Sequence, residues 1–97
     1  MVIGHDHLAG ELLRIAGQYD RAIPYYEAAR ESTASLNIPT EQAWTCSDYA
    51  EMLLDRDEPG DREKAIKLQD EALAITQELG MRPLTERILA RREILRA

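Results

Sequence analysis

The residues best suited to chemistry in this sequence are two histidines near its N-terminus, in the segment His5-Asp6-His7. Imidazoles at alternate positions can bind one zinc ion, but a zinc site needs at least three protein ligands. No distant third ligand is evident from the sequence. We therefore interpret the segment as a lead-in in which Asp6 caps the first helix, and we assign no metal ligand.

Cys46 is the only cysteine and the only candidate thiol nucleophile. A catalytic thiol needs a base beside it, and no recognisable histidine motif accompanies Cys46, so a small buried thiol is the better interpretation. A lone cysteine forms no intrachain disulfide, which favours a reducing compartment and predicts a cytoplasmic protein.

A group of acidic residues suggests calcium, but its spacing does not follow the helix–loop–helix calcium pattern. These residues are Glu51, Asp55, Asp57, Glu58 and Asp61, and we interpret most of them as a solvated loop. The sequence also lacks a phosphate-binding glycine loop, a nucleophile elbow and a zinc-protease motif. We assign no catalytic residue and no cofactor, and we expect the protein not to be an enzyme.

The charge of the chain limits its partners. It has 97 residues, with 18 acids against 12 bases and a net charge of -6. Such a field repels phosphate backbones, so we expect no nucleic-acid partner. The basic stretch 82–97 can dock against an acidic patch, but we favour a solvated helix face there.

Membrane contact is not expected either. No apolar run approaches the length that a bilayer requires, and the N-terminus lacks the basic stretch and apolar core of a signal peptide.

The helical spacing of apolar residues predicts five helices, and therefore an all-α fold in one domain covering residues 1–97. The expected elements are a first helix pair at 6–36, a second pair at 41–79 and a capping helix at 83–96. Asp20, Thr40 and Asp61 are expected to cap helix starts, and Gly17 and Gly80 to end helices in the left-handed conformation.

The same spacing predicts which side chains face inward. The first helix has a broad apolar face that includes Leu8, Leu12 and Ile15. In later helices Leu36, Ile66 and Leu79 are expected inside as well. Tyr25 and Trp44 are the aromatic residues expected to remain partly exposed.

Small residues recur at a fixed distance along the chain. Ala22 and Ala65 are 43 residues apart, as are Ala29 and Ala72. In the preceding helices, Leu13 and Leu53 are 40 apart. A period of this size indicates helical hairpins that stack on one another, each burying its apolar face on its neighbour.

The first unit carries small, turn and aromatic residues at characteristic places: Ala9, Gly10, Leu13, Gly17, Tyr19, Ala22, Tyr26 and Ala29. This pattern resembles the tetratricopeptide repeat. The resemblance covers about residues 6 to 79 and implies antiparallel hairpins stacked as a short right-handed superhelix. The second unit is looser, because Gln69 occupies the large aromatic position and Cys46, not Trp44, falls on the family's tryptophan position.

The segments 59–65, 72–75 and 78–81 also resemble the C-terminal repeat regions of large bacterial regulators. In those proteins such repeats follow an ATPase module and a nucleotide-cyclase or DNA-binding domain. The resemblance implies that the chain is the terminal segment of a longer regulator and that its role is to bind protein.

The resemblance also implies that the first helix of each hairpin lines a concave groove. Expected partner contacts there are His7, Glu11, Arg14, Trp44, Ser47, Glu51 and Asp55. Their mixed to acidic character suits a basic or polar peptide. The absence of lysine from them argues against recognition of a C-terminal carboxylate, and ordinary surface residues are an equally good interpretation.

Two other functions stay open. The first and fifth helices would leave apolar flanks, which favours self-association into a homodimer. The third hypothesis, which we favour least, is a small metal- or ligand-binding domain that uses the histidine segment.

Overall fold

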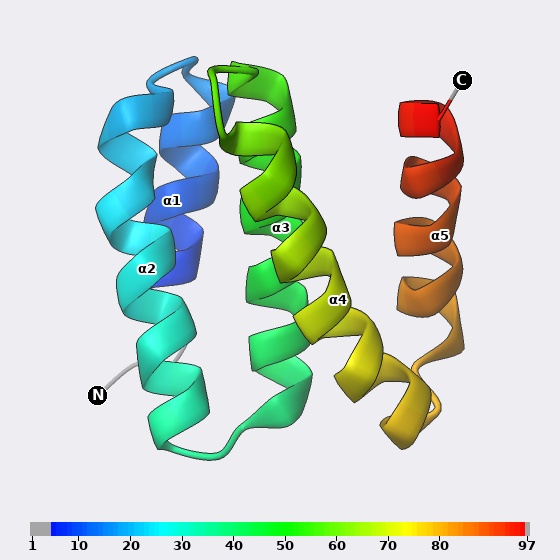
Figure 1. The fold of residues 1–97 in the computed structure, drawn as a ribbon. Helices are drawn as coiled ribbons and strands as arrows, with labels where there is room; N and C mark the ends of the chain where they lie inside the picture. Colours follow the sequence, from blue (N-terminus) through cyan, green and yellow to red (C-terminus); the bar gives the residue numbers. More distant parts are fainter. Residues whose placement is uncertain (1–4, 97) are drawn as a thin grey trace.

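The computed structural model describes residues 5–96, and among these it is all-helical (Figure 1). It contains five helices and no strand within that range, as predicted: α1 (His5–Ile15), α2 (Tyr19–Ser35), α3 (Pro39–Arg56), α4 (Asp61–Leu79) and α5 (Arg82–Arg96). The predicted domain of residues 1–97 also includes residues 1–4 and 97, which lie outside the described residues. No helix in the described part of the chain is long and apolar enough to cross a membrane.

Consecutive helices pack against each other in antiparallel order, because each connection is a short turn (Figure 1). The closest neighbours are α3 with α4, α1 with α2, and α2 with α3, whereas α5 packs less extensively on α4. A smaller contact joins α1 to α3. The sequence-based prediction of sequentially paired helices is confirmed.

Small residues and two tyrosines bring the helices close together. Ala22, Ala43, Ala50, Ala65 and Ala72 are all fully buried. A Cβ atom added to Gly10 of α1 would lie 3.1 Å from the Tyr26 ring of α2, so the missing side chain permits this contact. Tyr26 in turn stacks on Tyr49 of α3, with ring centroids 5.2 Å apart.

The predicted helix ends at Gly17 and Gly80 are confirmed, with φ values of 76° and 71°. The three predicted caps are wrong. Asp20 lies inside α2, because the residue that precedes this helix is Gln18, whose carbonyl accepts a hydrogen bond from the Ala22 N–H. Thr40 lies inside α3, because that helix starts at Pro39. Asp61 is the first residue of α4, and its buried carboxylate binds Arg56 instead of capping the helix.

Two further corrections concern α1. The helix begins at His5, so the histidine segment is helical and not a lead-in, and Asp6 lies in the first turn. The predicted inward face of α1 is also partly wrong: Leu8, Leu12 and Ile15 are 58%, 58% and 79% exposed. The reason is that α1 packs mainly on α2, and no described helix covers its other side.

Further along the chain, Leu36, Ile66 and Leu79 are exposed as well, contrary to the prediction. Leu36 and Leu79 lie at helix ends, where a neighbouring helix gives less cover. The expected partial exposure of Tyr25 and Trp44 is confirmed, at 42% and 37%.

Candidate functional site

The polar side chains of α1 and α3 meet along one side of the helix stack. His7 Nε2 lies 2.7 Å from Asp48 Oδ2, and Arg14 Nε donates to Asp55 Oδ2 at 2.9 Å. Both pairs join residues 41 positions apart. This separation is close to the sequence period, because adjacent parallel helices of neighbouring hairpins place equivalent turns side by side.

The basic helix α5 extends this surface on the other side of α3. Arg91 Nε lies 3.1 Å from Glu51 Oε2, and Arg87 lies 6.0 Å from the centre of the Trp44 ring. Arg87 also approaches Asp48, at 4.0 Å. The sequence favours a solvated face for this basic stretch, but Arg87, Arg91 and Arg92 instead pair with acidic groups of α3 and α4.

The seven residues predicted to contact a partner are therefore largely occupied by each other or by neighbours. Ser47 is buried. Trp44 and Asp55 are the exposed members of the set. Whether any of the seven binds a partner stays a prediction, and the contacts they make within the chain compete with that use.

A tighter cluster lies between α1 and α3. His7 and Glu11, one helical turn apart on α1, and Asp48 of α3 each place a ligand-type atom within 4.8 Å of the others. The Tyr26 hydroxyl donates to Glu11 Oε1, and Thr45 Oγ1 lies 3.4 Å from His7 Nδ1. Both histidine nitrogens and one Glu11 oxygen therefore have partners.

The electrostatics of this cluster follow from its contacts. The hydrogen bond to Asp48 raises the pKa of His7, and burial opposes that rise only in part. Burial, with the hydrogen bond to Glu11, raises the pKa of Tyr26, so its hydroxyl stays a donor. Sequence reasoning missed Asp48; the usable signal was its position one repeat length after His7.

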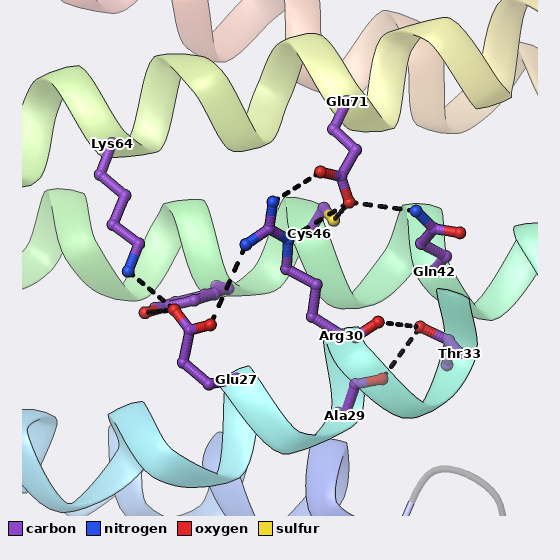
Figure 2. Close-up of polar contacts among 9 residues, drawn as sticks. Glu27, Ala29, Arg30, Thr33, Gln42, Cys46, Lys64 and Glu71 are labelled. Carbon is purple, nitrogen blue, oxygen red and sulfur yellow. Dashed lines mark hydrogen bonds and ion pairs between the residues drawn. The ribbon is translucent and has the colours of Figure 1, made fainter. Parts of the chain in front are cut away.

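A second polar cluster joins α2, α3 and α4 on another part of the stack (Figure 2). Arg30 Nη2 donates to Glu71 Oε1 at 2.7 Å, and Gln42 Nε2 and the Cys46 thiol donate to the other carboxylate oxygen at 3.1 and 2.9 Å. These bonds, led by that from Arg30, lower the pKa of Glu71 to about 2. Burial raises the pKa of Cys46, so its thiol stays protonated, in agreement with the interpretation of a non-nucleophilic cysteine.

The same face holds a smaller group around Glu27, which accepts from the Tyr49 hydroxyl at 2.5 Å and from Lys64 Nζ at 2.7 Å (Figure 2). Lys64 also lies over the Tyr49 ring, 5.1 Å from its centre. Each of these groups connects three helices, which indicates a structural role in fixing the stack.

The clearest unsatisfied surface is apolar. Leu8, Leu12 and Ile15 follow one another at spacings of four and three along α1, so they form one exposed stripe, which we call the α1 edge. When the two hairpins are aligned by matching Leu13 with Leu53, Met52 of α3 is the equivalent of Leu12. Met52 is fully buried because α3 lies between α2 and α4, whereas Leu12 is 58% exposed.

Comparison with known proteins adds no relative: no protein-family model, no curated protein sequence and no solved structure matches this chain.

Proposed function

We propose that this chain is a protein–protein interaction module that receives an amphipathic helix of another protein on the α1 edge. The observation that carries the proposal is the exposed stripe of Leu8, Leu12 and Ile15 on α1. The equivalent helix of the second hairpin, α3, packs on α2 along one side, where Tyr49 stacks on Tyr26. No helix among residues 5–96 packs on the corresponding side of α1.

The chemistry of the partner follows from this comparison. The helix that lies beside α3 is α2, which buries Ala22, Tyr26 and Ala29. A partner helix with small and aromatic residues on one face would continue the stack in the same way, and a helix in an apolar groove is a common mode of recognition. The contact would bury apolar surface that now faces water, which is the main driving force of association.

The tetratricopeptide-like pattern supports this assignment, since repeat stacks of that kind extend by adding hairpins at their ends. The proposal includes a short right-handed superhelix and a place at the C-terminal end of a larger bacterial regulator. The partner helix would then belong to that regulator or to a protein that binds it.

The experiment uses a synthetic peptide with the sequence of residues 19–36, which is α2 and the Leu36 that follows it, as the probe. Calorimetric titration of the full chain with this peptide should give saturable binding with one site. The Leu12→Glu variant should lose binding, because the carboxylate would be buried in an apolar contact. The Leu79→Glu variant places the same charge at an exposed leucine of α4 and should bind like the wild type.

Absence of saturable binding to the wild type would contradict the proposal, as would equal binding by the Leu12→Glu variant. Loss of binding in both variants would show a nonspecific apolar contact and would also contradict it.

A second candidate function is self-association, which the same stripe supports because a symmetric dimer can cover a patch on both copies. Light scattering distinguishes the two: a concentration-dependent dimer that the Leu12→Glu variant abolishes would favour self-association, and a monomer at high concentration would exclude it.

A further inference from the structure

The cluster of His7, Glu11 and Asp48 has the composition of a metal site. It offers one imidazole nitrogen and two carboxylates from two helices, with one ligand-type atom from each within 4.8 Å of the others. The sequence pairs His7 with His5, but residues two apart on a helix point to different faces. His7 instead meets Glu11, one turn along α1, and Asp48 of α3.

We propose that these three side chains bind a zinc-type divalent cation that connects α1 to α3. Zinc in proteins lies about 2.0–2.2 Å from nitrogen and carboxylate donors, which sets neighbouring donors about 3.3 Å apart in a tetrahedral site. His7 Nε2 and Asp48 Oδ2 are 2.7 Å apart. They therefore need to separate by roughly half an ångström to admit the ion.

The surrounding residues suit this role. When Nδ1 of His7 carries the proton, it can donate to Thr45 Oγ1, 3.4 Å away, and this leaves Nε2 free to bind the ion. The Tyr26 hydroxyl donates a hydrogen bond to Glu11, and the Tyr26 side chain is fully buried. Outer groups of this kind orient the ligands of metal sites.

The charges select the type of ion. A neutral imidazole with two carboxylates carries two negative charges, which a divalent cation balances. Magnesium and calcium prefer oxygen ligands alone, whereas a nitrogen and two oxygens leave zinc a fourth position for water.

Two nearby arginines lower the affinity of these carboxylates for a cation, but neither arginine occupies the position of the ion. Arg14 lies 3.7 Å from Glu11, and Arg87 lies 4.0 Å from Asp48. Each has another contact: Arg14 donates to Asp55, and Arg87 lies over Trp44. Both can therefore stay in place when the ion binds.

The test is a calorimetric titration of the metal-free full chain with zinc chloride at neutral pH, together with thermal unfolding in zinc. The wild type should bind one equivalent, and its Tm should rise with zinc concentration because the ion binds the folded state. The His7→Gln and Asp48→Asn variants should bind about tenfold more weakly or worse. His5→Ala is the matched control and should bind like the wild type.

Circular dichroism of each variant shows whether it is folded before zinc is added, and Glu11→Gln provides a third ligand variant. Wild-type affinity in two folded ligand variants would overturn the proposal, as would no binding to the wild type in millimolar zinc. Complete loss of binding in His5→Ala would also overturn it, since the ion would then lie at the N-terminal histidine pair.

Discussion

At the scale of single residues, each polar group in the two clusters is held by partners on other helices. Glu71 is the clearest case, because it accepts hydrogen bonds from one residue of α2 and two of α3. The sequence predicted none of these partners. Residue types and spacing define faces of a helix, but they do not define which polar side chains of two packed faces come within 3 Å.

We expect Glu71 to make stability depend on acid pH. Its pKa is about 2 in the folded chain against 4.5 without partners. Its contribution is therefore complete above pH 4.5 and is lost as pH falls from 4.5 towards 2. Solvent screening at this partly exposed site limits the loss to about 1–2 kcal/mol.

Urea unfolding at several acidic pH values measures this effect. The Glu71→Gln variant should lose less stability than the wild type over that range. Glu78→Gln removes an exposed carboxylate from the same helix and should keep the wild-type profile. The prediction fails if Glu71→Gln and the wild type show parallel curves.

Gly10 permits the close contact of α1 with α2, and a branched side chain there should destabilise the fold. The nearest atoms to an added Cβ belong to the Tyr26 ring, at 3.1 to 3.2 Å. That ring stacks on Tyr49 and has little freedom to move. Gly10→Val should therefore lower the free energy of unfolding by about 2 kcal/mol.

Chemical denaturation measures the difference, and Ala74→Val, at an exposed position in the middle of α4, is the control for a branched side chain on an exposed helix face. The control should lose less than about 1 kcal/mol. If Gly10→Val is as stable as the control, the Tyr26 ring can move aside at little cost, and the prediction is wrong.

At the scale of helices, the sequence predicted the number, type and order of the elements. The helical spacing of apolar residues and the glycines at 17 and 80 were sufficient, because both act locally. The helix starts were harder. Asp61 has the residue type of a cap, but the nearby guanidinium of Arg56 binds its carboxylate.

Arg56 should be important for joining three helices. It donates two hydrogen bonds to the buried Asp61 of α4 and one to Asp20 of α2, and its hydrogen bonds lower the pKa of Asp61. Replacing it by methionine leaves the Asp61 carboxylate buried without its cation. Arg56→Met should cost about 2 kcal/mol.

The matched control is Arg82→Met, which removes an exposed arginine paired with Glu86 on α5. It should cost less than about 0.5 kcal/mol. Equal costs for the two variants in denaturant unfolding would contradict a structural role for Arg56.

At the scale of the whole molecule, the apolar surface that stays exposed depends on which helices have neighbours on both sides. The sequence predicted uncovered apolar flanks at the first and fifth helices, but it placed Leu8, Leu12 and Ile15 of α1 inside. In α3 the apolar stripe is buried on two sides, whereas α1 leaves Leu8, Leu12 and Ile15 exposed. That asymmetry is the physical basis of the proposed interaction.

The most direct test of this account is an amide NMR titration of the isotope-labelled chain with the unlabelled α2 peptide. The account predicts that the largest shift changes occur at Leu8, Leu12, Ile15 and their neighbours on α1, while the amides of α4 change little. Changes centred on α4 or α5, or none at saturating peptide, would contradict the proposal that α1 receives a partner helix.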